Sequence, residues 1–189
     1  MKAFQLVIFT LLSFQFTGCA VLLGNIDPGS KKSEEYGYKD LSKFKSQWKK
    51  LNTQNSLNSI EMDLSAEEKN TRIPDVVYQS QITHSTISLN SSCKKSNSYS
   101  QHQLSDFTNT LLMGFSRIKE KHQTVTMISK KEALQTTILG KIENQKIKVR
   151  TIVTQINDCI YDFMYISRPQ FFEKEEADFS YFVTSTRLD

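Results

Sequence analysis

The sequence predicts an α+β domain, an antiparallel β-sheet meander with helices packed on it in an α/β/α sandwich-like arrangement. Between residues 123 and 166, apolar and polar residues alternate in consecutive short segments, which indicates adjacent antiparallel strands. Apolar residues recur at helical spacing before this region, starting at Leu104, and again after Pro169. Because helices and strands are segregated along the chain, α+β is favoured over a doubly wound α/β fold.

The start of the chain has the features of an export signal. Lys2 supplies a positive charge, residues 3–16 are uncharged and largely apolar, and small residues precede Cys19. Residues 16–19, Phe-Thr-Gly-Cys, resemble the lipobox of bacterial lipoproteins, although Phe16 stands where leucine is usual. We therefore expect residues 1–18 to be a signal peptide and Cys19 to be lipidated. An uncleaved membrane anchor and an ordinary signal peptide are the open alternatives.

The mature chain of 171 residues is long enough for one domain with a real core. Residues 19–38 lack apolar periodicity and predict a flexible tether, so the single periplasmic domain is expected to span residues 39–189. Apolar residues from Leu41 to Leu51, flanked by lysines, predict a basic amphipathic helix. This helix either packs Phe44 and Trp48 on the domain or lies on phospholipid head groups.

The remaining elements follow in order. Residues 52–74 predict a loop, residues 76–78 and 82–89 a pair of strands, and residues 90–101 a second loop. Helical spacing then predicts a helix through Leu104, Phe107, Leu111, Phe115 and Ile118. Four strands follow, the last over residues 159–166. A final helix opens at Pro169 and carries Phe172, Phe179, Phe182 and Val183, with Glu173, Glu175 and Glu176 in early turns that favour negative charge.

The cysteines form a simple set once Cys19 is assigned to lipid. Cys93 and Cys159 are then an even pair in an oxidising compartment, which favours a disulfide over two separate buried thiols. The mature chain carries a net charge of about +3, because Lys2 is lost from the formal +4. Lysines and acidic residues are interleaved, so neither charge nor location favours nucleic acid as a partner.

No motif for catalysis, for a cofactor or for a metal stands out. The chain has only six glycines, two of them within residues 1–24, which argues against phosphate-binding loops, and Ser116 lacks the context of a nucleophile elbow. The histidines are scattered rather than spaced as metal ligands; they are His84, His102 and His122. Asp158 fits a turn. Asp162, inside an apolar strand, faces solvent at a sheet edge, caps a loop or lines a groove.

The aromatic residues of the last predicted strand share one face. They are Tyr161, Phe163 and Tyr165, and we expect them to belong to the sheet core, with a binding groove as the alternative.

Several stretches resemble a group of uncharacterised predicted lipoproteins of Gram-negative bacteria. They are residues 75–78, 87–93 and 111–115, above all 157–165, and the closing helix around 179–183. These proteins are similar in topology to the photosystem II extrinsic subunit P fold, an antiparallel sheet between helical layers. The resemblance covers about residues 70–186. It implies this architecture and a cysteine pair placed like Cys93 and Cys159, but no activity.

The sequence thus predicts a lipid-anchored periplasmic domain that serves as a binding or accessory module of the cell envelope. Ala20 follows Cys19 in place of the aspartate that retains many lipoproteins in the inner membrane, so the periplasmic face of the outer membrane is expected. The expected partners are the membrane, through the lipid, and an unidentified envelope protein. The alternatives are an envelope enzyme of hydrolase type, whose residues converge only in three dimensions, and a redox-responsive sensor that uses Cys93 and Cys159.

Overall fold

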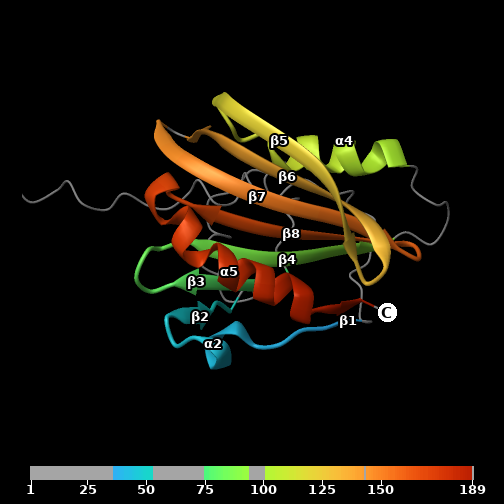
Figure 1. Ribbon diagram of the computed structural model, residues 1–189, viewed down its shortest axis with the longest axis horizontal. Helices are drawn as coiled ribbons and strands as arrows, with labels where there is room; N and C mark the ends of the chain where they lie inside the picture. The colour runs from blue at the N-terminus through green and yellow to red at the C-terminus, as the bar shows by residue number, and fades with distance from the viewer. Residues whose placement is uncertain (1–35, 53–74, 94–100, 143, 189) are drawn as a thin grey trace, which may run out of the picture.

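The computed structural model describes residues 36–52, 75–93, 101–142 and 144–188, and the backbone alone for residues 101–103. These residues form a seven-stranded antiparallel sheet with helices packed on it (Figure 1), which confirms the α+β class. The predicted signal peptide, Cys19, nearly all of the tether and most of the loop predicted over residues 52–74 lie outside the described residues.

The strand order in the sheet is β2-β3-β4-β8-β7-β6-β5, and every neighbouring pair is antiparallel. The four-strand meander predicted between residues 123 and 166 is confirmed as β5 to β8, whose connections include left-handed residues at Ser129, Lys130, Asn144 and Asn157. The bounds of the strands are β2 Trp48–Lys50, β3 Val76–Ser80, β4 Thr86–Cys93, β5 Arg117–Ile128, β6 Lys131–Ile142, β7 Gln145–Ile156 and β8 Cys159–Ser167.

Two helices cover opposite faces of this sheet. Helix α5, Pro169–Ser185, packs on the face that carries Tyr161, Phe163 and Tyr165, so the sheet-core interpretation of these aromatic residues is confirmed. Helix α4, Gln101–Leu111, packs on the other face, against the alternate residues of β7 and β8 such as Val153 and Met164. We call these the α5 face and the α4 face. Because strand side chains alternate, each central strand contributes to both cores.

The predicted basic helix over residues 41–51 is wrong beyond its first turn. Helix α2 spans only Leu41–Phe44, and Trp48 begins strand β2, whose register pairs Trp48 with Ser80. Phe44 is 46% exposed and its ring stacks on that of Tyr181 at 3.9 Å. Pairing with β3 thus overrides the helical spacing of the apolar residues.

The predicted helix through Leu104 is also shorter than expected. It ends at Leu111, and the amide of Ser116 already donates to the carbonyl of Lys141 at the end of β6. The ring of Phe115 lies over Gly140, where an added Cβ would come within 2.4 Å of the ring. The glycine therefore permits the close approach that carries the chain from α4 into β5.

Strand β4 extends through part of the loop predicted over residues 90–101. Asn90 and Cys93 are still paired with β8, opposite Asp162 and Cys159 respectively. Asp162 is accordingly buried in a central strand, 5% exposed, so its expected position in solvent at a sheet edge is wrong. The prediction failed because sequence spacing does not say which strand becomes the central one.

The described chain begins and ends in a second, two-stranded sheet. Strand β1, Tyr36–Gly37, pairs with β9, Arg187–Leu188, although the sequence places residues 36–38 at the end of the tether. Tyr36 and Tyr38 pack against the core of the α5 face. The first described residues are therefore fixed to the last ones.

Candidate functional site: a groove beside helix α5

The sheet is wider than the helix that covers its α5 face. Helix α5 contacts β7 and β8, whereas β5 and β6 continue past it (Figure 1). Two hollows of 360 and 650 Å³ lie on this face, and Gln135 lines both of them. We call the two hollows together the α5 groove.

The first hollow is lined mainly by polar side chains that the pleat of three strands directs to the same face. Cross-strand pairing places His122 opposite Thr137 and Thr124 opposite Gln135. The lining residues are Glu120, His122, Thr124, Gln135, Thr137, Leu139, Lys148 and Arg150. This part of the α5 groove presents hydroxyl, amide, imidazole, carboxylate and cationic groups side by side.

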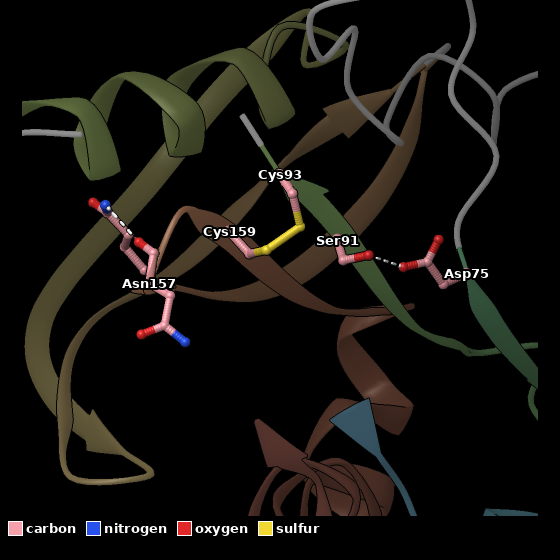
Figure 2. The surroundings of a disulfide bond; sticks show 6 residues. Asp75, Ser91, Cys93, Asn157 and Cys159 are labelled. Atoms are coloured by element: carbon pink, nitrogen blue, oxygen red, sulfur yellow. Dashed lines mark hydrogen bonds between the residues drawn. A yellow bond between two sulfur atoms is a disulfide. The ribbon is translucent and has the colours of Figure 1, made fainter. Parts of the chain in front are cut away.

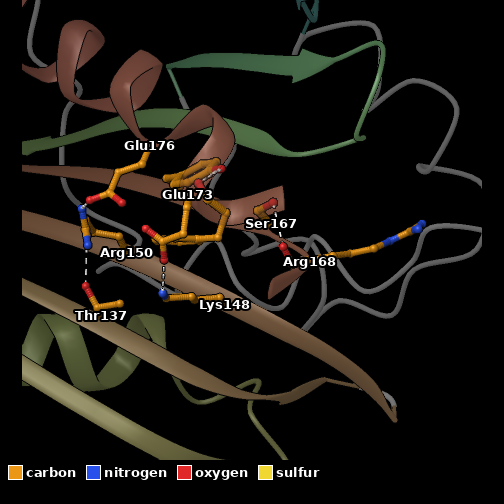
Figure 3. A network of polar contacts seen from close by, with 9 residues as sticks. Thr137, Lys148, Arg150, Ser167, Arg168, Glu173 and Glu176 are labelled. Atoms are coloured by element: carbon orange, nitrogen blue, oxygen red, sulfur yellow. Dashed lines mark hydrogen bonds and ion pairs between the residues drawn. The ribbon is translucent and has the colours of Figure 1, made fainter. Parts of the chain in front are cut away.

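The cations at this end are held in place by α5 (Figure 3). Arg150 donates through Nε to the hydroxyl of Thr137 at 3.0 Å and through its guanidinium to Glu176. The ammonium of Lys148 lies 2.6 Å from the carboxylate of Glu173. Both cations also lie over the ring of Phe172, at 4.4 Å for Lys148 and 5.4 Å for Arg150. The hydrogen bond from Lys148 lowers the pKa of Glu173 below its ordinary value.

These contacts correct the expected role of the acidic residues of the last helix. The first turn of α5 carries no acidic residue, so Glu173 and Glu176 act through side-chain ion pairs rather than through the helix dipole. The positive charge of the first hollow is neutralised by α5. An anion therefore has no free pair of cations to bind here, whereas a neutral polar ligand finds donors and acceptors already oriented.

The second hollow lies between the β5–β6 connection and the last turns of α5. Its lining combines hydroxyl, cationic and apolar side chains. The residues are Thr126, Met127, Ile128, Ser129, Lys130, Gln135, Ile152, Ser180, Val183, Thr184, Thr186, Arg187 and Leu188. The α5 groove thus changes along its length from a polar end to a more apolar one.

A buried polar cluster fixes the helix that borders the groove. Glu175, 3% exposed, accepts hydrogen bonds from Ser80 and Thr83 at 2.7 Å each and from Gln47 at 3.1 Å. Asp178, 1% exposed, accepts one from the indole of Trp48. These acidic groups attach α5 to strands β2 and β3 and to the turn that follows β3, because buried carboxylates are stable only when their oxygens are paired.

Sequence reasoning missed this cluster, although a signal was present. Phe172, Glu175, Phe179 and Phe182 share one helical face, so Glu175 lies on the apolar stripe of the predicted helix. A charged residue at such a position indicates a buried carboxylate with dedicated donors.

The structure joins Cys93 and Cys159 by a disulfide (Figure 2). The two residues are direct partners at the end of β4 and the start of β8. Beside the bridge, the hydroxyl of Ser91 donates to the carboxylate of Asp75, which precedes β3. The disulfide therefore closes one end of the central strand pair, away from the polar end of the α5 groove.

The other residues singled out in the sequence are dispersed. His84 lies in the β3–β4 turn with φ of 60°, His122 lies in the groove, and the side chain of His102 is outside the described residues. Asp158 occupies the β7–β8 turn, as expected. Among the described residues, no group of three or more histidines, cysteines or acidic residues is arranged to hold a metal ion.

A second polar feature lies inside the α4 face. Asn90, Ser92 and Thr151 are each at most 2% exposed, and their side-chain polar atoms have no hydrogen-bond partner among the described residues. Such atoms are rare in folded proteins, since each carries a desolvation cost.

Comparison with known proteins identifies the fold. No protein-family model matches the chain, and the comparison with curated proteins finds no similar sequence. Among solved structures, cyanobacterial PsbP (CyanoP) from Synechocystis sp. PCC 6803 matches with a TM-score of 0.51 and 10% identity, covering 85% of this chain and 91% of that one. The fold is PsbP-like. LpqN from Mycobacterium tuberculosis, a protein involved in cell envelope biogenesis, matches with a TM-score of 0.56 and 9% identity, covering 85% of this chain and 86% of that one.

This result agrees with the topology that the sequence resemblance implied. At such identities the likeness extends to the fold and no further. Within the described part of the chain, no helix is long and apolar enough to cross a membrane.

Proposed function

We propose that this protein is a lipid-anchored binding module of the bacterial cell envelope and that it binds its ligand in the α5 groove. The observation that carries the binding role is the groove itself, in which Lys148 and Arg150 are fixed by α5 beside the hydroxyl and amide groups of β5 and β6. Preorganised polar groups in a hollow are typical of ligand sites.

The proposed location follows from the sequence and agrees with two further observations. Residues 1–18 have the pattern of a lipoprotein signal, and Ala20 after Cys19 favours the outer membrane. A Cys93–Cys159 disulfide suits an exported protein, because cytosolic thiols are kept reduced. LpqN, which has a similar fold, is an envelope biogenesis protein. Several acyl chains on Cys19 would make the attachment effectively permanent.

The chemistry of the groove favours a neutral, hydroxyl-rich ligand. The cations of its polar end, Lys148 and Arg150, are already paired with Glu173 and Glu176. Gln135, His122 and Thr124 offer donors and acceptors at the same end. Proteins bind sugars through amide, imidazole and hydroxyl groups of this kind. Envelope glycan is accordingly the ligand class that we propose.

Binding can be tested with soluble muropeptides prepared from purified peptidoglycan. We expect saturable binding to the full-length protein in calorimetry and a loss of about tenfold in affinity in Gln135→Leu, through loss of a ligand hydrogen bond. Gln79→Leu, on β3 outside both hollows, is the matched control and should bind normally. Equal affinity in the two variants, or no binding in the wild type, would contradict a glycan site in the groove.

The anchor has its own test. Mass spectrometry of the mature N-terminus should find a diacyl or triacyl cysteine at position 19, and Cys19→Ser should release the protein from membranes. An unmodified Cys19 would contradict the lipid anchor but would not bear on ligand binding in the α5 groove.

An envelope hydrolase is the second candidate, favoured by one observation. Glu120 and His122 are two residues apart on β5 and line the same hollow, where an acid and a base could act together. If this is the function, His122→Ala abolishes turnover of an envelope substrate while muropeptide affinity is largely retained. A variant with undiminished turnover excludes the hydrolase role of His122.

A further inference from the structure

Strand β5 is an unusually long and open edge of the sheet. It spans the twelve residues Arg117–Ile128, lies at the end of the strand order with β6 as its one neighbour among the described strands, and is exposed over almost its whole length. The strand is about 40 Å long at 3.3 Å per residue. The opposite edge of the sheet, β2, has only three residues.

The two halves of β5 differ in chemistry. The first half carries three cations and one acidic residue, namely Arg117, Lys119, Lys121 and Glu120, and the pairing with β6 is irregular between Ile118 and Glu120. The second half, residues 123–128, is uncharged and rich in threonine and β-branched residues. Lysines and bulges are the usual protection of an edge strand against pairing, so the second half is the unprotected part.

Large apolar side chains of β5 are exposed on a single face. Val125 and Met127 are 65% and 62% exposed, and Ile118 is 46% exposed. Their partners on β6 are Leu134, Glu132 and Gly140, so all three point to the α4 face. They account for half of the six large apolar side chains that are notably exposed among the described residues. An exposed apolar row along an open edge marks an interaction surface.

We propose that β5 is an acceptor edge at which an extended segment of a partner protein adds one strand to the sheet. In β-strand addition, main-chain hydrogen bonds supply affinity and alternate side chains supply specificity. The sheet is antiparallel throughout, so the added segment runs antiparallel to β5. Its apolar half lies along residues 123–127 and contacts Val125. Its C-terminal half lies along residues 117–121 and carries acidic residues toward Lys119 and Lys121.

Charge decides between a partner segment and a second copy of this chain. If two β5 strands paired antiparallel, the lysine-rich half of each would lie against the uncharged half of the other and no cation would gain a counter-ion. An acidic segment neutralises the excess positive charge of the first half. The polar end of the α5 groove uses the other face of β5, and Met127 is the one residue of the exposed row that also lines the second hollow. The inference does not depend on what the groove binds.

The probe is a fluorescein-labelled peptide of about twelve residues, the length of β5, with alternating valine and threonine in its N-terminal half and three acidic residues in its C-terminal half. We expect saturable binding to the full-length protein at low salt, measured by fluorescence anisotropy. A peptide with the two halves exchanged should bind about tenfold more weakly, because its acidic residues would face the uncharged half. Hydrogen exchange should slow at the amides of residues 123–127.

Matched variants locate the site. The double change Lys119→Glu and Lys121→Glu should lower the affinity for the peptide by about tenfold or more. The control, Lys39→Glu with Lys49→Glu, alters the net charge equally and should change this affinity less than about twofold. Val125→Lys should weaken binding, and Ile82→Lys, at a side chain 71% exposed in the β3–β4 turn, should not. Gln135→Leu in the α5 groove should leave the peptide affinity unchanged.

The proposal is overturned if the peptide does not bind, if both peptide orders bind equally, or if the control pairs respond like the β5 variants. It is also overturned if sedimentation shows a dimer of the protein that Val125→Lys disperses, because the edge is then occupied by a second copy.

Discussion

The indole of Trp48 donates a hydrogen bond of 2.9 Å to the carboxylate of Asp178, a residue 130 positions later in the chain. Both side chains are 1% exposed, and the ammonium of Lys45 lies 2.5 Å from the other carboxylate oxygen. This contact joins the first described segment to the helix that borders the α5 groove. The position of α5, and so the shape of the groove, depends on it.

Trp48→Phe should lower the free energy of unfolding by about 1–3 kcal/mol, because a buried carboxylate oxygen loses its donor. Urea denaturation of Trp48→Phe, Asp178→Asn and the double variant should give a coupling energy of about 1 kcal/mol between the two positions. Phe44→Leu, at an exposed ring of the same segment, should cost less than about 0.5 kcal/mol. Additive effects at positions 48 and 178 would mean that the hydrogen bond contributes nothing to stability.

The sequence was sufficient where the periodicity is local and regular. The alternation from Val125 to Ile166 identified the meander, and the shared face of Tyr161, Phe163 and Tyr165 identified the core. Strand pairing of this kind follows chain order, so short turns define it. The resemblance at residues 157–165 implied the same topology.

The sequence was insufficient where distant residues decide the structure. The helical spacing of Leu41 and Trp48 is real, but pairing with Ser80 and the hydrogen bond to Asp178 make Trp48 part of a strand. Asp162 is buried because β4 and β7 flank its strand, which no local pattern reveals. The α5 groove exists because one helix covers only part of a wide sheet. The residues that line it could therefore not be predicted from the sequence.

The disulfide should act on stability. Replacing both Cys93 and Cys159 by serine should lower the free energy of unfolding by about 4 kcal/mol, since the bridge closes a loop with a sequence separation of 66 residues. Thiol titration of the native wild type should find neither residue reactive. If the double variant keeps its stability but loses a response to oxidants, the bridge is a redox sensor rather than a structural link.

Stability should fall in alkali because of buried tyrosines. Burial is the main reason that the pKa values of Tyr78 and Tyr165 lie above the ordinary value of tyrosine. The hydroxyl of Tyr165 also donates a hydrogen bond to the carbonyl of Phe172. A raised pKa in the folded state stabilises the protein fully below the unfolded pKa of about 10, and this contribution is lost as the pH rises toward the folded pKa. The ionisation of each tyrosine on unfolding should therefore lower the free energy of unfolding by up to about 1.4 kcal/mol for each pH unit above pH 10.

The measurement compares urea denaturation of the wild type and Tyr165→Phe from neutral pH to about pH 11. The variant should be less stable at neutral pH and lose less stability in alkali, because it has one fewer phenol to ionise on unfolding. Parallel pH profiles for the two proteins would show that Tyr165 ionises equally in both states.

Thr151 and Thr154 lie on the same strand, are both fully buried, and differ in the state of their hydroxyls. The hydroxyl of Thr154 donates to the carbonyl of Glu132 at 2.9 Å, whereas that of Thr151, on the opposite face, has no partner in the part of the chain that the structure describes. Valine has nearly the same shape as threonine without the hydroxyl. Thr154→Val should therefore lower the free energy of unfolding by about 1 kcal/mol, while Thr151→Val should raise it by a similar amount, because an unpaired buried hydroxyl is removed. Chemical denaturation of the two variants gives the comparison directly. A loss of stability in Thr151→Val equal to that in Thr154→Val would show that the hydroxyl of Thr151 is paired in solution, and that the polar interior of the α4 face, with Asn90 and Ser92, is a satisfied network.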